Sequence, residues 1–399
     1  MSALSSGRAA LNRICVCYSF DMTEERTLLL ISEHPEEGWG GPVHYISILI
    51  PVLRRSGFQV RLLADGGLSP RLLEFLEENN VRLLPRYGGL LRTRKLLIRL
   101  PRILRYPIES VLIATWLKLA EVKPHRVIVS LCSPGRYLWP HGLLGQASFI
   151  FHSEPAGSRH VLAGIIFRCL IGKKATFVGV SAWVSQSLQE VWGLRGNSVR
   201  QVTIKNPSTR RDTAPPYTPE DRRVVLMVGA ANEFKNPWFW LAVAKNVVEN
   251  GPAESIIFRW VGDGPLLPSM REWVREHKLS TAIELPGYSE DLAKHYEEAR
   301  LYFQCSLRET SSFSAIDAMS FGIPLVVSRV GGLDELVNNE RNGLKFRITS
   351  HQETAILLSG LYNDPERLKK LSRNAIRVSR EEYSHENWQR AVRENILQK

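Results

Sequence analysis

Two carboxylates, Glu309 and Asp317, stand eight positions apart in RETSSFSAIDAMSFGIPLVVSRVGGLDELV (308–337), ahead of an apolar run and a glycine pair. The preceding LYFQCS (301–306) predicts a buried strand, and a serine at 311 or 312 predicts the N-cap of a helix. Glu309 would then lie beyond the carboxyl end of a strand, where open α/β sheets bind ligands. Free amides at the helix start favour a phosphate, and a carboxylate just before them can accept hydrogen bonds from sugar hydroxyls. Asp317, in the second helical turn, could bind a ribose diol, so one carboxylate for each sugar would explain the spacing.

A structural alternative stays open for this pair. Glu309 could cap backbone amides, and Asp317 could be an exposed helix residue. Other catalytic signatures are absent from the sequence: it has no GxxxxGK[ST] loop, no HExxH, no GxSxG and no DxD pair. The five cysteines are scattered, with no CxxC pair and no His-rich cluster, which predicts no metal site and a reducing compartment.

Apolar runs bounded by turn residues alternate with helical periodicity along most of the chain, which predicts an α/β protein with parallel sheets covered by helices. Strands are expected in the first half at 27–32, 58–64, 126–131, 147–152 and 175–181, and in the second half at 224–230, 256–262, 282–287, 301–306 and 324–328. Helices are expected to begin near Pro42 and Pro237. The end of the chain is expected to be helical, with no obvious strand.

With 399 residues the chain is too long for one ordinary core, so two domains are expected. The segment 206–223, NPSTRRDTAPPYTPEDRR, is rich in proline and charge and predicts a linker. The expected units are a first domain (1–205, with residues 1–26 a poorly defined leader), a second domain (224–380) and a helical end (381–399).

The formal net charge of +12 indicates an anionic partner. The segment Arg82–Arg105 holds eight cations and no acid among Leu, Ile and Tyr, which is typical either of a segment at an anionic membrane surface or of a solvated basic helix. A nucleic-acid site is less favoured, because no helix-turn-helix, zinc-finger or RNP pattern occurs. With no signal peptide and no apolar run of about 18 to 20 residues, the expected location is cytoplasmic or peripheral on the membrane.

The 308–337 segment resembles the E-x7-E signature of the GT4 family of retaining glycosyltransferases, with Glu309 first and Asp317 second. Family-like pieces follow it (Ala318, Met319, Gly322 and Pro324; Gly331, Gly332 and Glu335), and others precede it in the expected order: GGPVHYISILIPVLRRSGFQV, VGVSAWVSQSL, IKNPS, VGDGPL and ELPGYSEDL. The resemblance runs from about Leu28 to Trp388. It implies a GT-B fold, in which two Rossmann-like, doubly wound domains face each other across a cleft. The second domain would hold the nucleotide sugar, the first would hold the acceptor, and SHENWQRAVREN would cross back onto the first domain.

The resemblance also implies roles for single residues. Glu309 would bind the hydroxyls of the donor sugar, and Asp317 the ribose. The amides around Ser312 and Phe313 would hold phosphate, and Lys235 would neutralise the leaving diphosphate in place of a metal ion.

Three glycines belong to the donor site that the resemblance implies. Gly229 matches a family glycine of that site. Gly40 and Gly41 would let the backbone of the first domain approach the donor. Read without the resemblance, Gly38 to Gly41 lack the third glycine of a dinucleotide fingerprint, so a nicotinamide-dependent enzyme is only weakly supported.

The sequence departs from the family pattern at three positions. The second carboxylate is Asp317 rather than glutamate. Ala230 stands where the family usually has an arginine, so that Arg308 or Arg329 would have to substitute unless Lys235 acts alone. Cys132 stands where many members have a histidine; His152 is the remaining first-domain candidate for the acceptor side, or else a packing residue at the end of a strand.

Two hypotheses follow. The first is a metal-independent retaining glycosyltransferase that needs no cofactor besides its substrate, a UDP- or GDP-linked sugar, and that acts on a glycan or lipid-linked acceptor at an anionic membrane surface. The second is an inactive GT-B scaffold at the membrane, favoured by the three departures.

Overall fold

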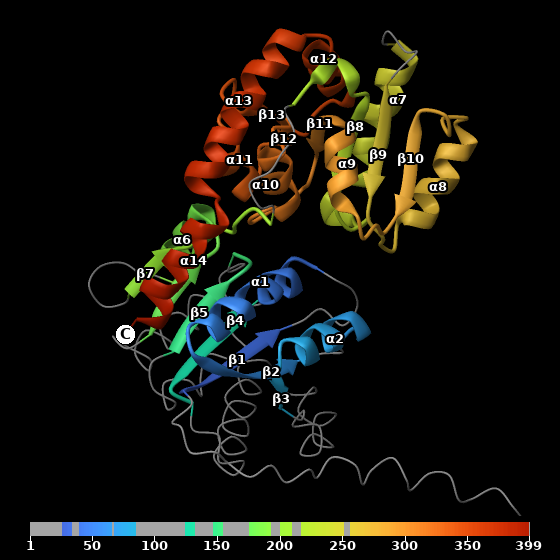
Figure 1. The fold of residues 1–399 in the computed structure, drawn as a ribbon. Helices are drawn as coiled ribbons and strands as arrows, with labels where there is room; N and C mark the ends of the chain where they lie inside the picture. The colour runs from blue at the N-terminus through green and yellow to red at the C-terminus, as the bar shows by residue number, and fades with distance from the viewer. Residues whose placement is uncertain are drawn as a thin grey trace, which may run out of the picture.

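The computed structural model describes residues 26–33, 40–65, 68–84, 124–131, 147–154, 175–192, 200–209, 217–250 and 256–398. They form two α/β units, one above the other in Figure 1. Most of the basic segment Arg82–Arg105 lies outside the described residues, as does Cys132.

The first unit is a seven-stranded parallel sheet with the order β3-β2-β1-β4-β5-β6-β7. Its strands are β1 (Arg26–Glu33), β2 (Phe58–Asp65), β3 (Arg82–Leu83), β4 (Arg126–Leu131), β5 (Ala147–Phe151), β6 (Thr176–Gly179) and β7 (Arg200–Thr203). The described helices are α1 (Gly41–Arg55), α2 (Pro70–Glu78) and α6 (Ala182–Trp192). Helix α1 begins at Gly41 with Pro42 in its first turn, where the missing N–H of proline costs nothing.

The second unit is a six-stranded parallel sheet with the order β10-β9-β8-β11-β12-β13. Its strands are β8 (Val224–Val228), β9 (Ile257–Val261), β10 (Ile283–Gly287), β11 (Ala299–Gln304), β12 (Leu325–Ser328) and β13 (Gly343–Phe346). The helices are α7 (Pro237–Asn250), α8 (Leu267–Glu276), α9 (Leu292–Glu298), α10 (Phe313–Ser320), α11 (Gly331–Leu336), α12 (His351–Tyr362) and α13 (Pro365–Glu382), with 3-10 turns η4 (Pro219–Asp221) and η5 (Glu233–Lys235).

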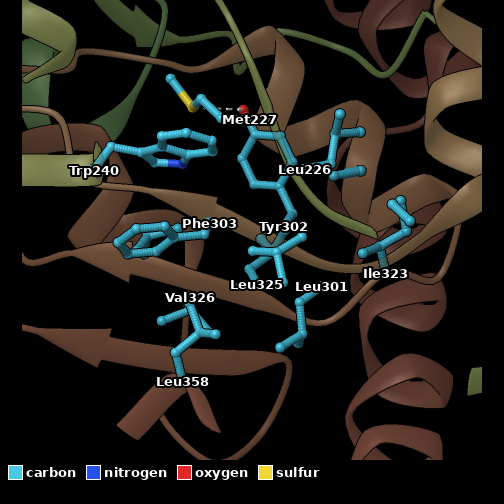
Figure 2. Close-up of a cluster of buried hydrophobic side chains, with 14 of the residues drawn as sticks. Leu226, Met227, Trp240, Leu301, Tyr302, Phe303, Ile323, Leu325, Val326 and Leu358 are labelled. Carbon is cyan, nitrogen blue, oxygen red and sulfur yellow. Dashed lines mark hydrogen bonds between the residues drawn. The ribbon is translucent and has the colours of Figure 1, made fainter. Parts of the chain in front are cut away.

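Each sheet reverses its strand order beside its first strand, between β1 and β4 in one unit and between β8 and β11 in the other. In doubly wound sheets such a reversal leaves a crevice at the carboxyl ends of the two strands, where ligands bind. The strands are apolar because helices cover both faces: Figure 2 shows Leu226, Trp240, Phe303 and Leu358 packed in the second unit, all buried. The predicted α/β fold with two Rossmann-like sheets is confirmed.

The end of the chain returns to the first unit. Helix α13 is followed by α14 (His385–Val392) and the π-helical turn η6 (Arg393–Leu397), which lie beside the first sheet in Figure 1. Trp388, Val392 and Ile396 are buried in the core of the first unit. Arg126 donates to the carbonyl of Leu397 at 3.3 Å.

One strand after residue 328, β13, was not predicted, whereas the end of the chain is helical as expected. β13 pairs with β12 in parallel register from Leu325↔Gly343 to Ser328↔Phe346. The short β3 and β7 were also missed; the pattern of β7, RQVT, is mostly polar because it lies at an edge of the sheet. Among the described residues no helix is long and apolar enough to cross a membrane.

Candidate active site

Glu309 lies in the loop between β11 and α10, at the carboxyl edge of the second sheet. Its Oε2 forms a close ion pair with Nζ of Lys235 and accepts a hydrogen bond from Nε2 of Gln304 at 3.0 Å. Its Oε1 accepts from the amide of Thr310 at 3.2 Å. The side chain is only 12% exposed, so its carboxylate is fixed before any ligand arrives.

Lys235 comes from the neighbouring β8–α7 connection. It ends η5, whose N-cap Asn232 accepts a hydrogen bond from the amide of Lys235 at 3.2 Å. Its aliphatic stem lies on Gly229, where an added Cβ would stand 3.5 Å from Cε of the lysine. Gly229 therefore seats the stem of Lys235, and this contact places the ammonium beside Glu309.

The glycine pair Gly331 and Gly332 holds the Glu309 loop from the other side. A Cβ on Gly331 would lie 2.1 Å from the carbonyl oxygen of Glu309, and one on Gly332 would lie 2.1 Å from that of Thr310. Gly331 also has a φ of +44°, which favours glycine. Since the amide of Gly332 donates to the Glu309 carbonyl at 2.8 Å, α11 begins directly against this loop.

Helix α10 begins where the sequence predicted. Ser312 is its N-cap and accepts from the amide of Ala315 at 3.3 Å. The next two amides, of Phe313 and Ser314, have no acceptor among the described residues. Such amides and the positive end of the helix dipole suit an anion. The phosphate role of Ser312 and Phe313 stays a prediction that this geometry allows.

Asp317 is buried and lies against the linker. Its carboxylate accepts from the hydroxyl of Ser208 at 3.2 Å, and from the amide and the hydroxyl of Thr209 at 2.7 Å each. The sequence-based alternative of an exposed helix residue was wrong. A ribose diol could reach Asp317 only by sharing these oxygens with the linker, and the ribose role stays a prediction.

The first unit meets the Glu309 loop at several points. The hydroxyl of Thr310 donates to the carbonyl of His152 at 2.7 Å, and Arg308 pairs with Glu154 at 3.2 Å. The ring of Phe313 contacts the ring of His44, with centroids 4.7 Å apart. Gly41 lies beside the same phenylalanine, because its added Cβ would be 4.0 Å from Cδ2.

Gly40 is the N-cap of α1 and therefore stands at the same junction of the two units. The position of Gly41 against Phe313 brings the first turn of α1 up to the start of α10. The roles of the two glycines toward a donor stay predictions.

His152 follows β5 directly, and its imidazole points into the first unit. Nε2 lies 2.8 Å from the hydroxyl of Ser130, and the ring packs edge-on against Tyr45. Burial lowers the pKa of His152 to about 3, so the ring is neutral at pH 7. The described contacts of the ring are those of a packing residue, and only its backbone carbonyl touches the loop of Glu309; its acceptor role stays a prediction.

Arg308 and Arg329, the possible substitutes for the cation missing at Ala230, do not contact Glu309. Arg308 pairs with Glu154, and Arg329 pairs with Asp334 at 3.4 Å. Lys235 is the cation that the structure places at the Glu309 carboxylate.

Sequence reasoning missed Gln304, which is fully buried at the end of β11. Its Oε1 accepts from the hydroxyls of Tyr302 at 3.2 Å and of Ser312 at 3.0 Å, and its Nε2 donates to Ser306 at 2.9 Å as well as to Glu309. The sequence feature that could have indicated its role is a long polar side chain, a glutamine, inside the apolar run LYFQCS. Its network ties the N-cap of α10 to the Glu309 carboxylate.

The sequence analysis also did not predict that Trp183 would contact Glu335 and Glu154. Glu335 accepts from the amide of Trp183 at 3.0 Å and so caps α6 from the opposite unit. The indole of Trp183 donates to Glu154. No local pattern could reveal these contacts, because they join residues far apart in sequence.

Two facing Rossmann-like units whose carboxyl edges carry the site define a GT-B protein, and solved structures share this fold. A glycosyltransferase from Rickettsia africae superposes with a TM-score of 0.71 at 17% identity, covering 94% of this chain and 100% of that one. Anabaena HepE in complex with UDP and glucose superposes with a TM-score of 0.69 at 15% identity, covering 93% of this chain and 99% of that one.

Residues 209–378 match the model of the family described as glycosyl transferases group 1, and the resemblance read from the motifs of that segment is confirmed by this match. Among curated proteins, the UDP-Gal:alpha-D-GlcNAc-diphosphoundecaprenol alpha-1,3-galactosyltransferase of Escherichia coli is 30% identical over 121 residues, 30% of this chain and 31% of that protein. The matches to the first such relatives span from 31% to 49% of their lengths.

Proposed function

We propose that this protein is a metal-independent retaining glycosyltransferase that moves a sugar from a nucleoside diphosphate to a glycan or lipid-linked acceptor. The observation that carries the proposal is the Lys235–Glu309 pair together with the first two amides of α10, which have no acceptor within the described part of the chain. It stands within the segment that matches the group 1 family. A cation, a carboxylate and two unpaired amides are the groups that a diphosphate and a sugar with several hydroxyls would use.

The donor is assigned to the second domain. Its diphosphate would lie against the amides of Phe313 and Ser314, and Lys235 would stabilise the charge that develops as the bond to the sugar breaks. Glu309 would accept hydrogen bonds from the hydroxyls of the sugar and so orient its anomeric carbon. The nucleoside would extend toward Asp317. HepE was crystallised with UDP and glucose, which supports a uridine or related nucleotide here.

The reaction retains configuration. The acceptor hydroxyl attacks the anomeric carbon on the face from which the diphosphate leaves, and the proton of that hydroxyl passes to an oxygen of the departing diphosphate. The products are the glycosylated acceptor and the nucleoside diphosphate. Lys235 would supply the positive charge that a metal ion supplies in DxD enzymes, and Glu309 needs no covalent role.

The acceptor side is assigned to the first domain. The relative from Escherichia coli carries a diphosphoundecaprenol acceptor in its name, which supports a lipid-linked acceptor. The eight cations between Arg82 and Arg105 support contact with an anionic membrane surface. We therefore place the enzyme on the cytoplasmic face of a membrane.

The proposal is tested with purified protein in EDTA against UDP-, GDP-, ADP- and TDP-sugars, by thermal shift and by slow donor hydrolysis. One nucleotide class is expected to raise the melting temperature. The variants Glu309→Ala and Lys235→Ala should each reduce hydrolysis by about 10²- to 10³-fold, the usual loss when one electrostatic stabiliser is removed. The matched control is Lys369→Ala, which breaks an exposed pair with Glu220 and should leave hydrolysis unchanged.

The inactive scaffold is the opposite outcome of the same experiment. If no nucleotide raises the melting temperature and anionic vesicles still bind the protein, catalysis is overturned. If hydrolysis requires an added divalent cation, metal independence alone fails.

A further inference from the structure

His44 has a buried nitrogen without a partner. It is the fourth residue of α1, and its Nε2 is buried with no hydrogen-bond partner in the part of the chain that the structure describes. A buried polar atom left unpaired costs about 1 to 3 kcal/mol. A phenylalanine at this position would pack without that cost, so packing alone does not account for the histidine.

The ring lies at the proposed donor site, on the opposite wall. It meets Phe313 edge-on, with centroids 4.7 Å apart and an interplanar angle of 83°. Phe313 is the first residue of α10, and its amide is one of the two without an acceptor among the described residues. A group held by these amides would lie at the start of α10, at the residue whose ring contacts His44. Gly41, one turn earlier on α1, leaves the space open because it has no side chain to fill it.

We infer that His44 is a donor-contacting residue of the first domain, whose Nε2 forms a hydrogen bond with an oxygen of the sugar–diphosphate portion of the nucleotide sugar. This inference rests on the proposed function. It gives the donor a contact on each wall: Lys235 and Glu309 from the second domain, and His44 from the first. Binding of the donor would then favour an arrangement in which both domains contact it at once.

The protonation state of His44 fits this role. Burial, and next the nearby charge of Arg71, lower its pKa to about 4. The imidazole is therefore neutral at pH 7, with one nitrogen that donates and one that accepts. A neutral ring can meet either a phosphate oxygen or a sugar hydroxyl.

The test compares His44→Phe, which keeps a ring against Phe313, with His44→Gln, which keeps a hydrogen-bonding group. His44→Phe is expected to raise the Kd and KM for the nucleotide sugar about tenfold, the worth of one such bond. The melting temperature of the free protein should stay the same or rise, because the unpaired nitrogen is gone. His44→Gln should recover part of the affinity.

The control is His277→Phe, at the C-cap of α8, where the ring stacks on Trp273 and not on Phe313. It should not change donor affinity. The affinity of His44→Phe is then measured for the nucleotide sugar and for the plain nucleoside diphosphate. If the affinity for both falls, the hydrogen bond of His44 is to the diphosphate. If only the affinity for the nucleotide sugar falls, the hydrogen bond is to the sugar.

Two results would overturn the inference. One is a His44→Phe variant that binds the donor as the wild type does; the other is a loss of affinity accompanied by an equal loss of stability in the free protein, since that would make His44 structural. If the wild type binds no nucleotide at all, the proposed function fails instead, and the two failures are distinguishable.

Discussion

Where the two units meet, the side formed by the second unit (the second-domain wall) and the side formed by the first unit (the first-domain wall) differ in how their polar groups are paired. On the second-domain wall, Glu309, Gln304 and Ser312 form one network in which each side chain has at least one partner. On the first-domain side, among the described residues, Ser32 Oγ and His44 Nε2 are buried and have none, and on the second-domain side, outside this network, Glu335 Oε1 also has no hydrogen-bond partner. Both sets lie at or near the carboxyl edge of a parallel sheet.

The difference indicates two ways of preparing a site. A network that is complete in the free protein is preorganised, so that a ligand pays no cost for ordering it. Polar atoms left unpaired in a buried position lower stability and become satisfied only when a ligand or water arrives. We therefore expect the second-domain wall to be as important for stability as for binding, and the first-domain wall to contribute to binding at the expense of stability.

The largest expected effect comes from breaking the complete network. In Gln304→Leu the volume is similar, but Glu309, Ser306 and Ser312 each lose a buried partner. The free energy of unfolding should fall by about 3 kcal/mol, and donor hydrolysis should fall with it. Urea denaturation and the hydrolysis assay measure the two effects.

A matched variant on the first sheet is Gln201→Leu. Gln201 makes one hydrogen bond to the Ser185 carbonyl at 2.6 Å, and its Oε1 is buried without a described partner. Its loss should cost about 1 kcal/mol and leave hydrolysis unchanged. Equal losses in the two variants would show that the network around Gln304 adds no more stability than a single buried hydrogen bond.

A smaller effect is expected at Asp317. Two variants distinguish its role in holding the linker from its proposed role in binding the nucleotide. Asp317→Asn removes the charge that Ser208 and Thr209 face, and should lower the free energy of unfolding by about 2 kcal/mol. Thr209→Val removes a single donor and should cost about 1 kcal/mol. If Asp317 also binds ribose, only Asp317→Asn will weaken nucleotide binding, measured by calorimetry. Equal weakening by Thr209→Val would mean that Asp317 acts on the nucleotide through the linker alone.

Much of the second-domain wall could be predicted from the sequence, because its signals are local. The serine before α10, the glycine pair and the carboxylate after an apolar strand each act on neighbouring backbone, so their positions follow from the order of residues. The two Rossmann-like sheets followed from the same alternation of apolar runs and helical patterns. β13 was missed because GLKF is short and carries a lysine in place of a continuous apolar run.

The contacts between the domains could not be predicted in this way. His44 meets Phe313 over a separation of hundreds of residues, and nothing in GGPVHYIS distinguishes a histidine at the cleft from one on a solvated helix face. Gln304 interrupts an apolar strand, but only the fold shows that Glu309 and Ser312 converge on it. The partners of Asp317 could be identified only from the path of the linker in the structure.

A pH dependence of the free energy of unfolding tests the first-domain wall directly. Burial lowers the pKa of His44 to about 4 and that of His152 to about 3, whereas both titrate near 6.5 in the unfolded chain. Between pH 5 and 6.5 the unfolded state therefore binds more protons than the folded state, and stability rises with pH before levelling above 6.5. Each histidine should contribute a slope that approaches about 1.4 kcal/mol per pH unit near pH 5 and averages about 1 kcal/mol per pH unit between pH 5 and 6.5.

The same window also contains His295, whose pKa is lowered by burial and by Arg259, so the total slope does not isolate the wall. The difference in slope between the wild type and the His44→Phe variant isolates the contribution of His44. His44→Phe should remove about 1 kcal/mol per pH unit from the mean slope measured by urea denaturation between pH 5 and 6.5. Carboxylates with lowered pKa values, such as Asp334, lose their contribution only at lower pH and should not enter this difference. An unchanged slope in His44→Phe would mean that the imidazole is protonated in the folded protein, with a partner that satisfies it, and the contrast between the two walls would then be lost at its central residue.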